Sequence, residues 1–446
     1  MNRLGWIQTA EHSLAEWNHL SALAAEVHAS GFERTLVCGM GGSSLAPQVL
    51  AASTARPRAP LHVLDSTDPA AVLAAEQAGD PARTLFVIAS KSGTTVETLA
   101  FYRYFAARAR PEQFIAITDP GTPLEALAKT QGFRAVVAHP ADVGGRYAAL
   151  TAVGMLPAAL LGLDGRTLLE RACALDPARA KTFGAQLAQG VSAGRDKLAL
   201  QPPAAVAMVA HWIEQLVAES SGKDGRGVVP LVDDPVSGTR PPSDTQVVTD
   251  ISGDPLDLGA EFLRWEFATW ELCERLGENA FDQPDVDDAK RLAREELDRA
   301  GTVGAQHAAP LPTLSPAELR ERARPGDYLA ILAYLPPLPE VTAALQQIRA
   351  AWGRALGCAT TLGFGPRYLH STGQLHKGGP NTGLFLVITA DDAEDLEIPE
   401  QGGTFGELKR AQARGDVRAL LARGRRIAHV HLSRPEDVGA LAPHAS

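Results

Sequence analysis

Short apolar runs alternate along the first third of the chain with longer segments in which apolar residues recur at helical spacing. The runs predict strands at 34–38, 61–64, 84–89 and 114–118. The segment 9–30, rich in Ala, Leu and Glu, predicts an amphipathic helix. Strands that are buried on both faces are apolar at nearly every position, so this pattern predicts an α/β fold with a parallel sheet covered by helices on both sides.

A second α/β unit is predicted from about 198 onward, because apolar runs again alternate with helical patterns. Its predicted strands are 227–232, 246–249, 328–334, 360–364, 384–389 and 427–431. We therefore divide the chain into an N-terminal helix at 1–30, a first unit at 31–185 and a second unit with a C-terminal extension at 186–446.

Composition narrows the class of protein. The chain has 446 residues, and its 45% hydrophobic and 21% charged residues are typical of a globular protein with two or three packed units. A net charge of −10 argues against nucleic acid as a main partner. The first ten residues lack a basic segment followed by an apolar core, and the most apolar stretch, 148–163, contains Gly154 and Pro157. It predicts a pair of buried helices, so we expect neither a signal peptide nor a membrane span.

The four cysteines, Cys38, Cys173, Cys273 and Cys358, are far apart in the sequence. They form neither a CxxC motif nor a Cys/His cluster. Such a distribution is typical of reduced thiols in a cytosolic protein rather than of disulfides or a zinc site.

Two polar loops follow predicted strands at the sheet edge where ligands bind in parallel α/β folds. The first, GMGGSS at 39–44, offers backbone N–H groups and a helix N-terminus to an anion, with Gly42 and Ser43 at its centre. The second, SKSGTT at 90–95, has four hydroxyl groups and one ammonium group, although a single side chain is enough to cap a helix.

We expect the second loop to bind a phosphate group. The three acceptor oxygens of a phosphomonoester match the hydroxyls of Ser90, Ser92 and Thr95, with Lys91 as a further contributor. Acidic residues that could bind Mg²⁺ do not accompany these loops, so the phosphate is expected to anchor the substrate rather than to be transferred. We therefore expect neither a metal nor an organic cofactor.

Two such loops in one α/β unit resemble the sugar isomerase (SIS) domain. Further motifs are similar to those of the glucose-6-phosphate (phosphoglucose) isomerase family: VGGRY at 143–147, ESSGK at 219–223, FDQ at 281–283 followed by Lys290, and LHSTGQ at 369–374. Ser221 stands where the family usually has Asn. The resemblance implies two SIS-type αβα sandwiches, each with a mainly parallel, Rossmann-like sheet of five strands.

The order of these motifs departs from the family pattern. The His segment usually precedes the FDQ segment, whereas His370 here follows Lys290. This order is more similar to the isomerase half of bacterial transaldolase–phosphoglucose isomerase fusions, here without an additional N-terminal barrel domain.

The resemblance implies a catalytic role for four residues. Glu219 would be the base that moves a proton between C2 and C1, and Arg146 would stabilise the negative charge of the enediolate, with the backbone of Gly145 near the substrate. His370 and Lys290 would open the sugar ring, and Gln283 would hydrogen-bond the sugar phosphate.

Each of these residues also has a structural interpretation. Glu219 could be an exposed glutamate near a helix end, and Arg146 could form an ion pair with an acidic residue such as Glu97. Lys290 could be a solvated lysine on a helix face. His370 could be structural, with His376 taking its role in ring opening.

The expected activity is the reversible isomerisation of glucose 6-phosphate and fructose 6-phosphate through a cis-enediolate, as in glycolysis and gluconeogenesis. A dual phosphoglucose/phosphomannose isomerase and a non-catalytic sugar-phosphate-binding protein remain alternatives. By the same resemblance we expect a cytoplasmic homodimer that binds a small sugar phosphate, in which one active-site histidine comes from the partner chain.

Overall fold

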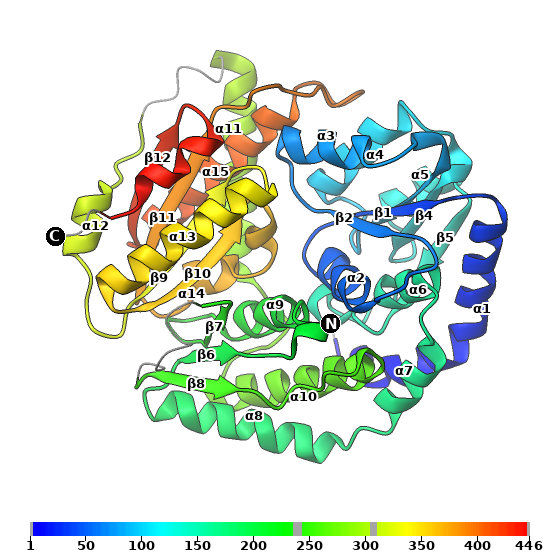
Figure 1. The fold of residues 1–446 in the computed structure, drawn as a ribbon, viewed down its shortest axis with the longest axis horizontal. Helices are drawn as coiled ribbons and strands as arrows, with labels where there is room; N and C mark the ends of the chain where they lie inside the picture. Colours follow the sequence, from blue (N-terminus) through cyan, green and yellow to red (C-terminus); the bar gives the residue numbers. More distant parts are fainter. Residues whose placement is uncertain (1–2, 235–242, 304–309, 444–446) are drawn as a thin grey trace.

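A computed structural model describes residues 3–234, 243–303 and 310–443 of the chain. Its first sheet has five parallel strands in the order β2-β1-β3-β4-β5 (Figure 1). The strands are β1 (Arg34–Gly39), β2 (Leu61–Leu64), β3 (Thr84–Ala89), β4 (Phe114–Thr118) and β5 (Ala135–Ala138). The α/β class and the parallel sheet predicted from the apolar runs are confirmed.

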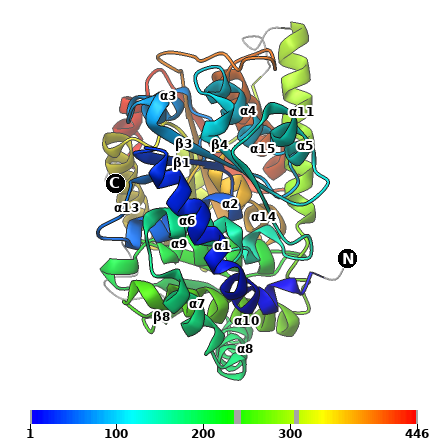
Figure 2. The same ribbon diagram turned by 90° about the vertical axis from the view of Figure 1, so that its right-hand side faces the viewer.

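Helices cover both faces of this sheet, as the strand pattern predicts. They are α2 (Gly42–Ser53), α3 (Pro69–Gln77), α4 (Val96–Ala106), α5 (Pro123–Gln131) and α6 (Ala152–Leu161). Successive strand residues alternate between two cores, so that Val87 packs with α2 and α6 while Phe86 packs with α4 and α5. The predicted N-terminal helix is α1 (Thr9–Ala29), which lies across α6 (Figure 2).

The second half of the chain contains two further sheets, both fully parallel. One has four strands in the order β10-β9-β11-β12, and the other has three strands in the order β7-β6-β8. The strands are β6 (Lys197–Leu200), β7 (Val229–Val232), β8 (Thr245–Val248), β9 (Tyr328–Tyr334), β10 (Ala359–Phe364), β11 (Gly383–Ala390) and β12 (Arg426–Leu432). Only the first sheet therefore has the expected five strands, because the described strands of the second half divide between two sheets.

Helices again surround these sheets. They are α7 (Gly165–Cys173), α8 (Pro177–Ser192), α9 (Val209–Ser221), α10 (Leu258–Leu276), α11 (Pro284–Val303), α12 (Pro316–Glu321), α13 (Pro339–Leu356), α14 (Gly373–Gly378) and α15 (Phe405–Ala422). The stretch 148–163 forms the single helix α6 rather than a helix pair, because Pro157 is accommodated inside it. No helix in the described residues is long and apolar enough to cross a membrane.

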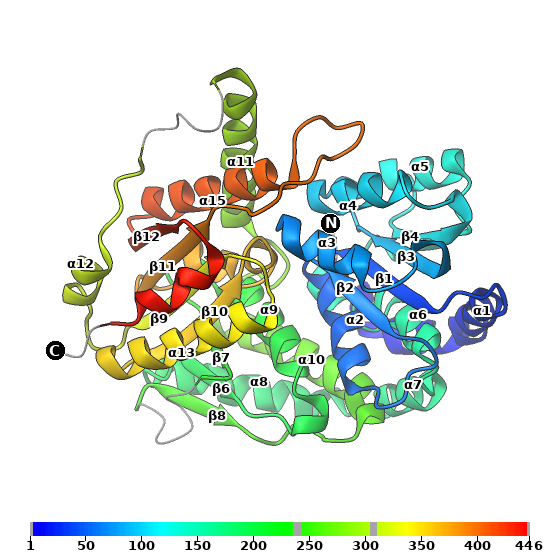
Figure 3. The ribbon, with the colours of Figure 1, turned by 45° about the horizontal axis from the view of Figure 1, so that its top comes forward.

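The second half of the chain packs against the first sheet at the loop that follows β2. This loop has the sequence DSTD at 65–68 and is called the DSTD loop below. Lys409 of α15 donates to Asp68 over 2.7 Å, and Thr67 donates to Gln412 of the same helix over 2.9 Å. Phe405, at the start of α15, stacks on Phe101 of α4. Figure 3 shows α15 beside α11, with the preceding segment reaching toward α4. The DSTD loop therefore joins the two halves of the molecule.

Candidate active site

Glu219 lies in the last turn of α9, where its carboxylate faces Arg146. Oε1 of Glu219 is 3.4 Å from Nη1 of Arg146, and both side chains are at most 10% exposed. Gln215, one helical turn earlier, donates from Nε2 to Oε2 of Glu219 over 3.1 Å. The two oxygens of this buried carboxylate are thus fixed by different partners.

Glycines bring the loop that carries Arg146 close to the first Gly-rich loop. A Cβ atom on Gly42 would lie 2.0 Å from the carbonyl oxygen of Gly145, so a larger residue could not occupy position 42. A Cβ atom on Gly145 would meet no atom within 4 Å, which leaves open space beside Arg146. The two loops therefore meet through their backbones, with room for a ligand on one side.

His370 reaches the same place from the second half of the chain. It ends the short helix η8 (Arg367–His370), and its carbonyl oxygen accepts from Nε2 of Gln215 over 2.8 Å. A Cβ atom on Gly41, which has φ 55°, would lie 2.7 Å from that carbonyl oxygen. Glycine at this position therefore allows the backbone of His370 to approach the first loop.

The ring of His370 contacts Glu97 of α4. Nε2 of His370 is 2.9 Å from Oε1 of Glu97, and Nε2 of Gln412 donates to the same oxygen over 2.7 Å. Burial alone would raise the pKa of Glu97, but the charge and hydrogen bond of His370, together with the charge of Lys290, hold that pKa below its usual value. Glu97 is therefore a buried, ionised partner of His370 and does not pair with Arg146 as the structural interpretation suggested.

His376 lies in the core of the second half. It is 2% exposed, its Nδ1 is 3.1 Å from the hydroxyl of Tyr328, and its ring packs against Phe385. Burial, with the nearby charges of Lys377 and Arg425, lowers its pKa well below the ordinary value. These surroundings are those of a neutral structural histidine.

The SKSGTT loop joins β3 to α4, as predicted. The hydroxyl of Thr95, the N-cap residue of α4, makes no capping hydrogen bond and instead lies 2.9 Å from that of Ser90. The hydroxyls of Ser92 and Thr94 are also 2.9 Å apart. Helix capping therefore does not account for the hydroxyls of this loop, which agrees with a ligand-binding role.

Lys91 points away from those hydroxyls. Its ammonium group forms an ion pair with Asp119 and donates to the carbonyl oxygen of Ala141 over 3.0 Å. The side chain thus joins three loops at the carboxyl edge of the first sheet. In this arrangement it supports the loop, and its predicted contact with a phosphate group would require it to leave Asp119.

The ESSGK and FDQ motifs meet beside Arg146. Lys223 forms an ion pair of 2.7 Å with Asp282, and Arg146 donates to the carbonyl oxygen of Asp282 over 3.2 Å. Burial, together with the charge of Arg146, lowers the pKa of Lys223, while the hydrogen bond to Asp282 opposes that shift. Gln283 follows directly, and its side chain is half-buried at the start of α11.

Three residues of this cluster were not predicted as part of the site: Gln215, Glu97 and Gln412. Gln215 could have been found from the sequence, because residues four positions apart on a helix lie on the same face and Gln215 is four positions before Glu219. Glu97 lies two residues beyond the hydroxyl-rich loop, in the first turn of the following helix. No pattern in the sequence points to Gln412, because its contacts with Glu97 and Thr67 join residues more than 300 positions apart.

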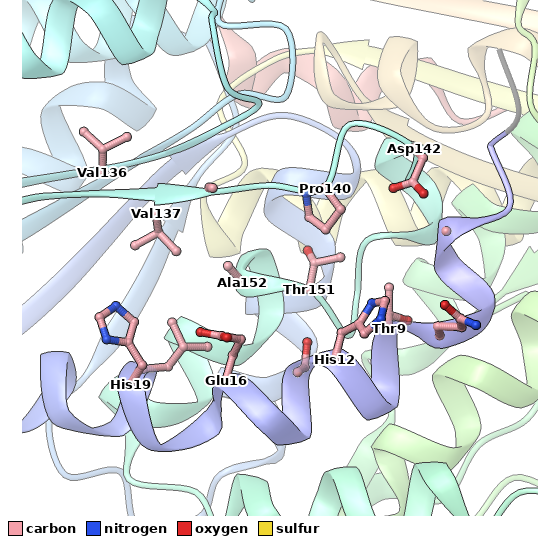
Figure 4. Close-up of a pocket in the computed structure, with 15 residues that line it drawn as sticks. Thr9, His12, Glu16, His19, Val136, Val137, Pro140, Asp142, Thr151 and Ala152 are labelled. Atoms are coloured by element: carbon pink, nitrogen blue, oxygen red, sulfur yellow. The ribbon is translucent and has the colours of Figure 1, made fainter.

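A cavity of about 430 Å³ lies elsewhere, between α1 and the edge strand β5 (Figure 4). His12, Glu16 and His19 line it from α1, and Val137 lines it from β5. None of the predicted catalytic or phosphate-binding residues lines this cavity. Among the described residues, no three His, Cys, Asp or Glu side chains are grouped so that they could hold a metal ion.

The fold and the loops define the class of protein as an α/β protein with parallel sheets, in which polar loops follow the strands of the first sheet. A solved structure of a glucose-6-phosphate isomerase from Chlamydia trachomatis D/UW-3/Cx has the same fold. Its TM-score is 0.55 at 18% sequence identity, and the match covers 66% of this chain and 75% of that chain.

The sequence comparisons find similarity to one particular family. Residues 28–183 match the family model of phosphoglucose isomerase. A glucose-6-phosphate isomerase of Synechococcus sp. (strain JA-3-3Ab) is 37% identical over 218 residues, which cover 43% of this chain and 40% of that protein. One of Thermus thermophilus is 38% identical over 145 residues, covering 31% of this chain and 35% of that protein. The resemblance inferred from the motifs is thereby confirmed, although the match spans less than half the length of either relative.

Proposed function

We propose that this protein interconverts glucose 6-phosphate and fructose 6-phosphate through a cis-enediolate. The observation that carries the proposal is the pairing of a buried carboxylate, Glu219, with the guanidinium of Arg146 at 3.4 Å. Such a pair supplies both requirements of the reaction, a base that can return the proton it takes and a positive charge for the enediolate oxygen.

In the proposed proton transfer, Glu219 takes the proton from C2 of the open-chain aldose and returns it to C1. Gln215 holds Oε2 of this carboxylate, so Oε1, which faces Arg146, is the oxygen assigned to the proton transfer. Arg146 stabilises the charge on the enediolate without accepting a proton, since its guanidinium stays protonated throughout. Fixing these groups before the reaction lowers the cost of reorganising them in the transition state.

Ring opening is assigned in this proposal to His370 and Lys290. A histidine can both donate and accept a proton near neutral pH, as ring opening requires. The contact of His370 with Glu97 and the position of His376 inside the core favour His370 for this role. The charge of Lys290 acts on Glu97, which supports a position for the lysine at the same end of the site.

Binding of the sugar phosphate is assigned to the two loops of the first sheet. Ser90, Ser92 and Thr95 offer hydroxyls to the phosphate oxygens, and the N-terminus of α4 adds favourable partial charge. Gly42 and Ser43 begin α2, which supplies a second helix N-terminus. Gln283, which follows Asp282 beside Arg146, completes the proposed set.

We also propose that the protein is a cytoplasmic homodimer. Within each chain, we propose that the boundary between the two α/β units lies at 185/186. The four cysteines are free thiols, which agrees with a reducing compartment. Because His370 reaches Gln215 and Glu97 within its own chain, the proposed site needs no residue from a partner. Dimerisation would therefore serve stability rather than complete the catalytic set.

The experiment that tests the proposal measures isomerase activity on fructose 6-phosphate, with mannose 6-phosphate in parallel. We expect the wild type to form glucose 6-phosphate, and Glu219→Gln to lose at least ~100-fold in rate, since it removes the general base. Glu214→Gln on the same helix is the matched control and should retain activity. A folded wild type that turns over neither sugar would refute the proposal in favour of a non-catalytic sugar-phosphate-binding protein, and turnover of mannose 6-phosphate would extend it to a dual isomerase.

A further inference from the structure

Gln412 links Glu97, the partner of His370, to Thr67 in the loop that follows β2. It lies on α15 and is 4% exposed. Its side-chain Nε2 is 2.7 Å from Oε1 of Glu97, and its Oε1 is 2.9 Å from the hydroxyl of Thr67. Glu97 and Thr67 are themselves at most 4% exposed, so water does not compete for these contacts.

The chemistry of the three groups sets the direction of each hydrogen bond. An ionised carboxylate only accepts, so the group of Gln412 that faces Glu97 is its NH₂. The amide oxygen then faces Thr67, whose hydroxyl donates to it. Thr67 thus fixes the orientation of the Gln412 amide, and the amide presents a donor to Glu97.

This arrangement also decides which ring nitrogen of His370 carries the proton. Nε2 of His370 faces the same oxygen of Glu97 at 2.9 Å, and a carboxylate that accepts there requires a proton on Nε2. In the neutral imidazole, Nδ1 is then the free nitrogen and the one able to exchange a proton with a substrate. A protonated or rotated Glu97 would no longer impose this tautomer.

We propose that Gln412 is a positioning residue, which holds the carboxylate of Glu97 oriented so that His370 presents Nδ1 to the sugar ring. Gln412 contacts no predicted substrate group and acts only through Glu97. The inference rests on the proposed isomerase function, because ring opening is the step that it serves.

The competing explanation is that Gln412 only attaches α15 to the first sheet. Lys409 already does so through Asp68, one turn earlier on the same helix, and Asp392 accepts from the same ammonium group. A purely structural Gln412 would affect stability and all catalytic steps alike. A positioning role would affect ring opening and leave proton transfer in the open-chain sugar largely unchanged.

The test compares two substrates in Gln412→Leu. Fructose 6-phosphate must be opened, whereas its analogue without a hydroxyl group on C5 cannot close the furanose ring and needs no opening. We expect kcat on fructose 6-phosphate to fall about 10-fold or more, with KM changed less than twofold, and kcat on the 5-deoxy analogue to stay within twofold of the wild type. An equal loss on both substrates, or no loss on either, would overturn the proposal.

Gln113→Leu is the matched control. Gln113 is a glutamine buried to 1% exposure that donates to the carbonyl oxygens of Pro81 and Thr84, at the start of β4. Loss of the Gln113 side-chain amide should lower the melting temperature. It should change kcat on fructose 6-phosphate and kcat on the 5-deoxy analogue by the same factor. In Gln412→Glu, the new carboxylate must share a proton with Glu97, so kcat on fructose 6-phosphate should decrease as the pH rises and that proton is lost.

A measurement without substrate separates this inference from the proposed function. In protein labelled with ¹⁵N-histidine, the His370 signal, identified by its loss in His370→Asn, should show a proton on Nε2 in the neutral wild type. Gln412→Leu should show a mixture of both tautomers. If the wild type is inactive on fructose 6-phosphate, the function fails while this spectrum still tests Gln412, and an unchanged tautomer in Gln412→Leu refutes the positioning role.

Discussion

Oε1 of Glu219 lies 3.4 Å from Nη1 of Arg146, and the two residues come from different units of the predicted division at 185/186. Arg146 belongs to the loop after the first sheet, and Glu219 lies in the last turn of α9, a helix of the second half that packs against α2 of the first. Because both side chains are almost completely buried, each charge depends on the other and on the few polar groups around them. Their pairing makes the meeting point of the two halves the centre of the proposed chemistry.

Arg146→Ala should lower kcat/KM for fructose 6-phosphate by about 100- to 1000-fold, because the positive charge that faces the enediolate is lost. Arg146→Lys should recover part of this loss, since it restores the charge but not the planar guanidinium. Steady-state kinetics at saturating and low substrate provide the measurement. Arg171→Ala, which breaks a surface ion pair with Asp254 and Asp257, is the control and should leave the kinetics unchanged.

Removing two loop hydroxyls in Ser90→Ala/Thr95→Ala should weaken substrate binding. Hydrogen bonds to a charged group contribute about 1.5–3 kcal/mol each, so KM should rise at least 10-fold while kcat changes little. Thr94→Ala removes a hydroxyl from the same loop that is outside the predicted phosphate contacts, and its KM should stay near that of the wild type. An unchanged KM in the double variant would exclude this loop as the phosphate site.

His370→Asn and His376→Asn should have opposite effects. The first should reduce kcat on fructose 6-phosphate about 100-fold, because the ring-opening group is lost, with little change in melting temperature. The second should lower stability by about 1–3 kcal/mol by disturbing the buried partner of Tyr328, and should leave kcat at 25 °C within a few-fold of the wild type. The assignment would be reversed if His376→Asn were the inactive, stable protein.

Glu214 makes the stability of the protein depend on pH. Burial, aided by the charge of Asp233 and opposed by those of Arg349 and Arg367, raises its pKa from 4.5 to about 7, and burial lowers that of the adjacent His211 to about 3. The pKa of Glu214 is higher in the folded state than in the unfolded state. Between pH 4.5 and about 7, the folded state therefore binds more protons than the unfolded state. The contribution of Glu214 to the free energy of unfolding therefore falls as the pH rises from about 4.5 to about 7.

Glu214→Gln should remove this dependence. We expect its melting temperature to be close to that of the wild type at pH 4.5 and higher than that of the wild type at pH 8, where the difference corresponds to about 2–3 kcal/mol. Glu170→Gln, at an exposed position on α7, should follow the wild type at both pH values. Equal melting temperatures for Glu214→Gln and wild type at pH 8 would contradict the raised pKa.

Activity should not require association of two chains. His370, Glu97, Gln215 and Glu219 contact one another within a single chain. The specific activity should therefore stay constant while the protein is diluted through the concentration at which light scattering detects monomers. A loss of activity that follows dissociation would show that a partner chain contributes to the site.

The strands of the first sheet could be predicted from the sequence because they are apolar on both faces. The predicted runs at 61–64, 84–89 and 114–118 agree with the observed strands, and the run at 34–38 is one residue short. Two of the strands in the described residues were missed. β5 is a short edge strand of Ala and Val, and β6 begins with Lys197, which is buried only because Asp196 and Asp244 neutralise it.

The motifs of the proposed site could be recognised in the sequence because each is a short, continuous segment. Position 41 shows which information the sequence lacks. Only glycine fits there, because the backbone of His370, which is distant in the chain, approaches too closely for a larger residue. The same holds for Glu97 and Gln412, whose roles depend on how the halves pack. Motif spacing contains no information about such contacts, because side chains from distant elements meet only in the folded state.

The contacts of α15 with the DSTD loop have a consequence for how the protein is made. Asp68 and Lys409 are 341 positions apart, and Thr67 and Gln412 are 345 positions apart. Since a chain emerges from the ribosome N-terminus first and its domains fold in that order, the first sheet and Glu219 are present long before Gln412 is translated. A nascent or prematurely terminated chain could thus form the phosphate loop while Glu97 still lacks its partner from α15. Catalytic competence would then appear only after α15 has been translated.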